Sequence, residues 1–271
     1  MEVAFSSLAY PELDLAGVVG RVKSFGYDAL ELRVADDGKH IRPSYPLSVN
    51  DSETLKSVRV VDLAAYARFS SDQAQNDKAQ RLVGTLSQIA SDLGARAVRV
   101  YVADVNEGAA KALDASAKIA DRYDVKIMVE THDPVLSRLH NLQAFLQKSQ
   151  KAWVLYDPAN MIYAGERHEK VFPFIKDRIA HVHLKDFVFS GEKRVFCRPG
   201  IGVVPIKDIV KDLKESGYKG ALSVEWERLW NPEMEPADGV LPDYLKYLRS
   251  LLQEVGWSGT RDYKRRDIQR F

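Results

Sequence analysis

Eight short apolar stretches, separated mostly by helical patterns, constrain the fold of this chain more than any other feature. They read EVAFSSLA, DALELRV, SVRVVDLAA, AVRVYVA, VKIMVE, WVLYDP, IAHVHLKD and ALSVEW. Between them, segments such as NDKAQRLVGTLSQIASDL and IKDIVKDLKES place apolar residues three and four positions apart, as amphipathic helices do. A strand alternating with a helix eight times predicts an α/β fold, a single (β/α)₈ TIM barrel.

Glycines indicate where three of the predicted helices end. Gly26, Gly94 and Gly217 each follow an amphipathic segment and precede an apolar one, so we expect left-handed helix terminators at these positions. Residues 36–56 contain a glycine and two prolines, which predicts a loop with a short helix. Barrels of about 250 residues form one domain, so we expect residues 1–271 to be a single domain. Its polar, basic tail, residues 258–271, is interpreted as surface or as a homo-oligomer contact.

Composition excludes several classes of protein. Lys and Arg number 39 against 38 Asp and Glu, and this net charge of +1 is unlike that of a nucleic-acid binder. The single cysteine, Cys197, excludes an internal disulfide and a zinc cluster built on cysteines. The sequence contains neither a signal-peptide pattern nor an apolar run of about 18 residues, so no membrane partner is expected. We therefore predict a cytoplasmic protein.

Four potential metal ligands each close an apolar run in the second half of the chain. They are Glu130, Asp157, His183 and Glu225, at intervals of 27, 26 and 42 residues. One strand, one helix and two loops need roughly 25 to 40 residues, so the ligands are expected to converge at one end of the barrel. Hard oxygens with one imidazole suit one divalent ion, Mn²⁺, Mg²⁺, Co²⁺ or Zn²⁺.

Strand geometry refines this set. Side chains two positions apart face the same way, so His181 and His183 both point into the barrel, with His183 nearer the C-terminal mouth. His183 is the predicted ligand, and His181 is expected to support it or to lie in the core. The same parity pairs Glu130 with His132 and Glu225 with Glu227.

The segments MVETHD, YDPAN, HVHLKD and LSVEWE, in this order at the strand ends, resemble the xylose isomerase-like TIM barrel superfamily of sugar isomerases and epimerases. The resemblance implies that Glu130, Asp157, His183 and Glu225 bind one divalent metal, with the two glutamates as acid and base. Lys185 and Asp186 fall in the HxHxKD segment of many members. Asn160 stands where several epimerases carry histidine, which departs from a ketose 3-epimerase. Ile201 stands where relatives often carry glutamate, so the usual polar contact of that glutamate is not expected.

The chemistry of such enzymes accounts for these residue types. Proton transfer between adjacent carbons of a hydroxy-carbonyl compound passes through an enediolate, whose charge a cation stabilises. Glu130 and Glu225 are the candidates for moving the proton. A glycine-containing loop at residues 187–206 is expected over the active face, and Trp226 and Trp230 near the eighth strand are candidates for an apolar wall behind a sugar. The candidate substrate-binding residues are His132, Asn160, Lys185, Arg194, Arg198 and Trp226.

The sequence thus predicts a divalent-metal-dependent isomerase or epimerase of a small sugar or hydroxy-carbonyl compound. A metal-dependent dehydratase of a keto-polyol, such as a keto-inositol or a dehydroshikimate-like compound, uses the same residues and is the main alternative. A noncatalytic sugar-binding barrel is another alternative. A DNA-repair endonuclease fits less well, because the six histidines do not form a site for several metals.

Overall fold

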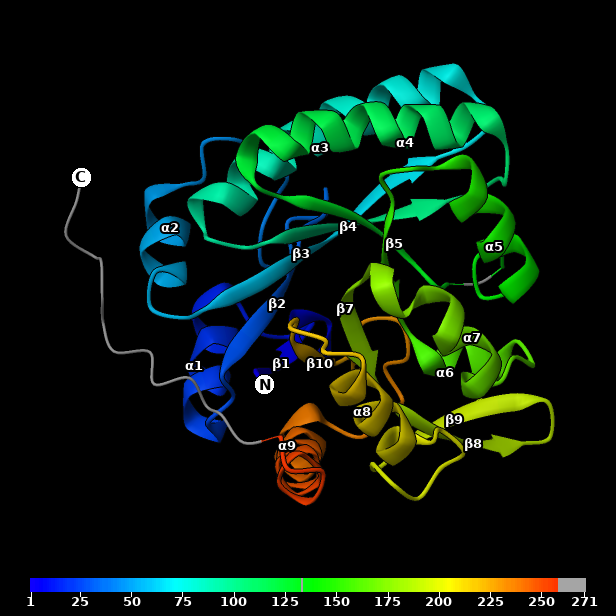
Figure 1. The fold of residues 1–271 in the computed structure, drawn as a ribbon. Helices are drawn as coiled ribbons and strands as arrows, with labels where there is room; N and C mark the ends of the chain where they lie inside the picture. The colour runs from blue at the N-terminus through cyan, green and yellow to red at the C-terminus, as the bar shows by residue number, and fades with distance from the viewer. Residues whose placement is uncertain (133, 258–271) are drawn as a thin grey trace.

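The computed structural model describes residues 1–132 and 134–257, and at its centre eight parallel strands close into a barrel (Figure 1). Going round the barrel the order is β1-β10-β7-β6-β5-β4-β3-β2, so strands that follow one another in the barrel repeat are also neighbours in space. The barrel strands are β1 (Val3–Ser6), β2 (Ala29–Arg33), β3 (Val60–Phe69), β4 (Ala97–Val102), β5 (Lys126–Glu130), β6 (Trp153–Tyr156), β7 (Ile179–Leu184) and β10 (Leu222–Val224). All eight coincide with the apolar stretches of the sequence, which confirms the predicted barrel.

Helices follow the strands and cover the outside of the barrel (Figure 1). They are α1 (Leu15–Phe25), α2 (Val49–Leu55), α3 (Gln73–Asp92), α4 (Glu107–Ala120), α5 (Leu139–Lys148), α6 (Pro158–Tyr163), α7 (His168–Ile175), α8 (Ile206–Glu215) and α9 (Ala237–Glu254). The predicted glycine terminators are confirmed, with φ of 80° at Gly26, 66° at Gly94 and 75° at Gly217. Helix α2 is the short helix expected within residues 36–56. No helix in the described ranges has both the length and the apolar composition that a bilayer crossing requires.

The segment predicted as a plain loop after β7 contains a β-hairpin instead. Strands β8 (Asp186–Ser190) and β9 (Lys193–Cys197) pair antiparallel and project from the barrel at its C-terminal end (Figure 1). The buried Asp186 carboxylate anchors the chain after the hairpin, since it accepts N–H bonds from Gly200, Gly202 and Val204 at 2.9–3.1 Å. The predicted tail, residues 258–271, lies outside the described residues.

The interior of the barrel is arranged in layers. Small and apolar side chains occupy its N-terminal end, namely Ala4, Ala29, Val61, Ala97, Met128, Leu155 and Ala221. Charged and polar side chains follow towards the C-terminal end, and all are buried: Glu31, Asp62, Arg99, Glu130, His181 and His183. Buried charges are costly unless they are paired or coordinate a metal. Packing alone does not account for the charged residues at the centre of this barrel, which makes them candidates for a functional site.

Candidate metal centre

The four predicted ligands meet at the C-terminal end of the barrel. Glu130 is the last residue of β5, Asp157 and Glu225 directly follow β6 and β10, and His183 lies within β7. One ligand atom from each lies within 4.8 Å of the others. From His183 Nδ1, the nearest carboxylate oxygens are 3.3 Å away on Glu225, 3.7 Å on Glu130 and 3.8 Å on Asp157. The parallel barrel thus brings together residues separated by up to 95 positions in the sequence.

Two buried atoms of this quartet are suited to bind a cation. In the described part of the chain, neither His183 Nδ1 nor Glu130 Oε1 has a hydrogen-bond partner. Buried polar atoms almost always have one, so an unsatisfied pair in one site requires an explanation. Three carboxylates and an imidazole suit a divalent ion such as Mn²⁺ or Zn²⁺. The residues present therefore fit the metal that the sequence predicts.

Lys185 lies fully buried among three carboxylates of this end of the barrel. Its Nζ is 2.6 Å from Asp157 Oδ2 and 2.5 Å from Glu227 Oε1, and it donates to Glu225 Oε2. Burial alone would lower the pKa of Lys185, but the three carboxylates outweigh burial and hold this pKa well above its ordinary value. Lys185 is therefore an ammonium ion whose single positive charge is shared by Glu227 and two of the four candidate ligands, Asp157 and Glu225.

Glu130 differs from Glu225 in its partner. Its Oε2 accepts a hydrogen bond from Arg99 Nη1 at 2.8 Å, and both side chains are buried. Burial raises the pKa of Glu130, but the guanidinium of Arg99, and after it the neighbouring His132, outweigh burial and hold this pKa well below its ordinary value. Arg99 also donates to the carbonyl of Ala65 at 3.2 Å, which fixes the guanidinium in place.

His183 is held from behind by Glu31 of β2. Glu31 Oε2 lies 2.7 Å from His183 Nε2 and 3.1 Å from His181 Nε2. Burial lowers the pKa of His183, but Glu225 and Glu31 more than compensate and raise it well above its ordinary value. A metal on Nδ1 would displace the proton there, while Glu31 keeps the proton on Nε2 and orients the ring. His181 thus supports His183 through a shared carboxylate.

Aromatic rings and a second arginine line one side of this mouth. Tyr101 lies 5.2 Å from the His132 ring, and Tyr66 lies 6.1 Å from Tyr101, between ring centroids. Arg33 donates to the Tyr66 hydroxyl at 2.8 Å, and the exposed Trp230 ring lies 5.8 Å from its guanidinium. Such rings offer an apolar wall with polar edges to a small ligand.

Two further predicted residues reach the site through the hairpin. Asn160, in the first turn of α6, donates to Asp157 Oδ2 at 3.0 Å and so orients one candidate ligand. Arg194 of β9 donates to Asn160 Oδ1 at 2.7 Å and lies 3.8 Å from Glu227 Oε2. The hairpin therefore covers the α6 side of the mouth.

The structure does not bring Arg198 and Trp226 to the site. Arg198 is bound at the surface by Asp243 and Glu235, next to helix α9. Trp226 is buried, its indole N–H donates to the carbonyl of Glu235 at 2.9 Å, and its ring packs against Tyr244. For Trp226 the reason is strand parity, because a residue next to the inward-facing Glu225 faces outward. For Arg198 the reason is its ion pairs with Asp243 and Glu235.

Sequence analysis missed Glu31, Arg33, Asp62 and Arg99. All four interrupt apolar strands, in ALELR, VVDLA and AVRVYV. A charged residue inside an otherwise apolar strand is the available signal, since strand parity can assign its side chain to the barrel interior.

Comparison with known proteins identifies the family. The model of the family described as xylose isomerase-like TIM barrel matches residues 19–251. The chain belongs to the xylose isomerase-like TIM barrel family. The resemblance drawn from the strand-end motifs is thereby confirmed.

Individual relatives differ in activity. An inosose dehydratase of Geobacillus thermodenitrificans is 33% identical over 94 residues, 29% of this chain and 32% of the relative, so the match spans about a third of that protein. A putative L-ribulose-5-phosphate 3-epimerase, SgbU of Escherichia coli K12, is 24% identical over 261 residues, 87% of this chain and 90% of the relative. Among solved structures, the IolI protein with a bound zinc atom has a TM-score of 0.74 and 18% identity, covering 93% of this chain and 99% of that chain.

Proposed function

We propose that this family member is a divalent-metal-dependent dehydratase of a small polyhydroxy ketone. The enzyme would remove a proton from the carbon next to the carbonyl and release the hydroxyl of the neighbouring carbon as water. The observation that carries this choice is the difference between the two glutamates of the quartet. Glu130 is bound by Arg99 at 2.8 Å, whereas Glu225 contacts the ammonium of Lys185.

Glu130 is unsuited to accept a proton. One of its oxygens is bonded to Arg99, and its other oxygen faces His183 Nδ1, so a metal would occupy it. The pKa values of Glu130 and Glu225 both lie well below the ordinary value, so the difference between the two glutamates is their partner: Arg99 binds Glu130, and Lys185 contacts Glu225. Two-base epimerisation is therefore hindered on the Glu130 side.

Glu225 and Lys185 form the couple that handles protons. A carboxylate beside a buried ammonium can take a proton from carbon while the ammonium gives one to the departing hydroxyl. The electron pair of the broken C–H bond forms the new double bond, and the C–O bond breaks to give water. Glu227 on the other side of Lys185, at 2.5 Å, holds the ammonium in place.

The quartet would hold the divalent ion, which when bound stabilises negative charge on the carbonyl oxygen of the substrate. Arg99 has a second role here, because its Nη2 lacks a hydrogen-bond partner among residues 1–132 and 134–257. A buried guanidinium N–H without a partner is a donor that a substrate oxygen can satisfy. The zinc of the IolI protein and the dehydratases among the relatives support this assignment.

A second candidate is the isomerase or epimerase expected from the sequence. The relative SgbU favours it, since that match covers most of both chains. It requires Glu130 to leave Arg99 and act as the second base. Asn160 in place of a histidine counts against it.

The two chemistries differ in the mass of the product. We would incubate the chain with keto-inositols, ketoses and dehydroshikimate in Mn²⁺, Mg²⁺, Co²⁺ or Zn²⁺, in D₂O, and read products by mass spectrometry. Dehydration gives a product lighter by one water, whereas epimerisation gives the substrate mass with deuterium incorporated.

Two matched variants separate the roles of the glutamates. Glu225→Gln should stop both deuterium exchange and product formation at full metal occupancy, because the proton acceptor is lost. Glu130→Gln should act mainly through weaker metal binding, so excess metal should restore much of the turnover. Restored turnover in Glu225→Gln, or an isobaric deuterated product from the wild type, would reject the dehydratase.

A further inference from the structure

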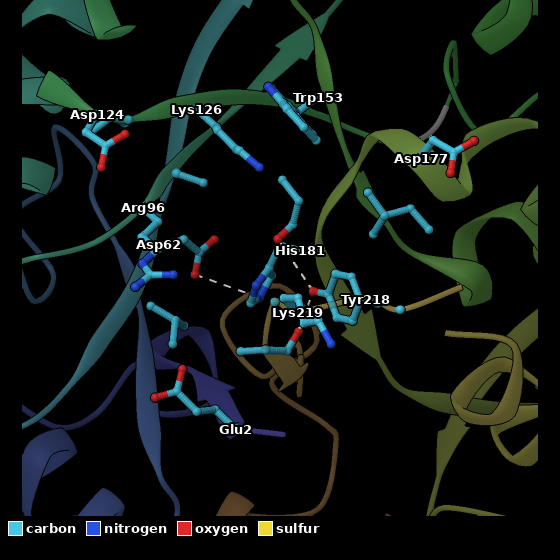
Figure 2. A pocket seen from close by; sticks show the side chains of 18 of the residues that line it. Glu2, Asp62, Arg96, Asp124, Lys126, Trp153, Asp177, His181, Tyr218 and Lys219 are labelled. Carbon is cyan, nitrogen blue, oxygen red and sulfur yellow. Dashed lines mark hydrogen bonds and ion pairs between the residues drawn. The ribbon is translucent and has the colours of Figure 1, made fainter. Parts of the chain in front are cut away.

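The barrel is hollow at its N-terminal end, opposite the candidate metal centre. A cavity of about 720 Å³ opens there among residues at the beginnings of the strands (Figure 2). Bulky branched side chains usually fill the interior of such barrels. Here the lining includes Ala97, Ala180 and Ala221, whose methyl groups leave the space open. The N-terminal end of a barrel ordinarily contributes to stability through its packing. An open cavity at this end does not contribute in that way.

Asp62 of β3 and His181 of β7 form the inner end of the cavity. Both side chains are buried, and Asp62 Oδ1 lies 3.8 Å from His181 Nε2, across the contact drawn in Figure 2. In residues 1–132 and 134–257, neither carboxylate oxygen of Asp62 has a hydrogen-bond partner. Burying an ionised carboxylate without a partner costs on the order of several kcal/mol in desolvation. A cation would remove this penalty.

Glu31 borders the same position. Its Oε2 is shared by His181 and His183, but its Oε1 has no hydrogen-bond partner in the described ranges. One oxygen of each of these two buried carboxylates therefore lies near His181 Nε2, at 3.1 Å for Glu31 Oε2 and 3.8 Å for Asp62 Oδ1. Unsatisfied buried polar groups in a native protein require an explanation, and a bound ion is one.

We infer that Asp62, Glu31 and His181 bind a divalent transition-metal ion, reached through the N-terminal cavity. Two carboxylates supply the negative charge, and the imidazole favours a transition metal over Mg²⁺ or Ca²⁺. Bonds of 2.0–2.2 Å in tetrahedral zinc sites place ligand atoms about 3.4 Å apart. His181 Nε2 lies 3.1 Å from Glu31 Oε2 and 3.8 Å from Asp62 Oδ1, and these distances bracket that value.

This lower site is separate from the quartet. It uses none of the four candidate ligands at the C-terminal end, and His183 contributes only the N–H that Glu31 accepts. His183 thus faces the quartet with Nδ1 and the lower site with Nε2. Ion binding at the lower site does not depend on the reaction proposed above.

The test is the zinc content of the full-length chain. After treatment with a chelator, the protein is dialysed against zinc and the bound ions are counted per chain. The wild type should retain two ions and Asp62→Asn one, with affinity for the lower ion reduced at least about tenfold. Asp157→Asn should lose the upper ion and keep the lower one. The matched control Asp124→Asn, on the rim of the cavity, should retain two.

These counts distinguish the two proposals. If the quartet binds no zinc, the wild type should hold one ion and Asp62→Asn none. Anomalous diffraction from zinc-soaked wild-type crystals gives a readout that needs no variant, with a peak expected about 2.0–2.2 Å from Asp62 and His181. Equal zinc affinity in wild type and Asp62→Asn, or a soaked crystal without that peak, would overturn the inference.

Discussion

Replacing Lys185 by methionine tests the charge balance of the candidate metal centre. Met has a similar length, so the change removes the ammonium that contacts Asp157, Glu225 and Glu227 without opening a large cavity. Removing one partner of a buried ion pair typically reduces the free energy of unfolding by about 3–5 kcal/mol. For a chain of this size each kcal/mol corresponds to roughly 2–4 °C, so the melting midpoint in chelator should fall by about 6–20 °C.

Metal should reverse much of this loss. A divalent ion in the quartet would neutralise Asp157 and Glu225 in place of Lys185, so the difference between variant and wild type should shrink when Mn²⁺ or Zn²⁺ is added. Calorimetry or circular dichroism melts with chelator and with metal measure both quantities. The control is Lys211→Met, whose exposed pair with Glu215 at 3.9 Å should contribute little. A Lys185→Met protein that melts with the wild type in chelator would refute the reasoning.

Three other changes probe separate parts of the molecule. Burial raises the pKa of Asp62 to about 7, so its contribution to stability is complete below pH 4 and is lost as the pH rises through about 7. In chelator, the stability advantage of Asp62→Asn over wild type in urea unfolding should therefore grow from pH 5 to pH 8; a constant difference would contradict this. Gly202→Ala should destabilise the chain by about 1–3 kcal/mol, because the new Cβ would lie 2.1 Å from Asp186 Oδ1; unchanged urea unfolding would exclude that contact. Arg99→Met should lower the free energy of unfolding by about 3–5 kcal/mol, because Glu130 stays buried without its partner. If Glu130 instead becomes protonated in the folded variant, refolding should take up a proton.

Much of the architecture follows from the sequence because barrel geometry is regular. Glu130, Asp157, His183 and Glu225 could be expected to converge, since the carboxyl ends of parallel strands meet at one mouth. Parity on strands then placed His181 beneath His183. Neither inference needed a side-chain conformation.

The remaining parts depend on contacts between distant strands. Arg99 contacts Glu130 because β4 lies beside β5, and Glu31 contacts His181 and His183 because β2 lies across the barrel from β7. The sequence alone does not identify these partners. Trp226 was expected at the site because it adjoins Glu225, although parity turns it outward. The hairpin β8–β9 was hidden because glycines and a proline suggested a loop, while the Asp186 carboxylate that organises the following backbone acts on residues 14–18 positions later.

Adjacent residues of the HxHxKD segment have unrelated tasks. Lys185 points to the carboxylates at the mouth. The carboxylate of the neighbouring Asp186 instead accepts backbone N–H bonds from residues 200–204, and the backbone N–H of Asp186 donates to the hydroxyl of Tyr244. A family alignment would display both letters as one motif, and a turnover assay would lose signal when either was changed. Position 186 would then be mistaken for part of the chemistry, although its carboxylate only fastens the segment after the hairpin. Comparing metal content with protease resistance of residues 187–206 would tell the two roles apart.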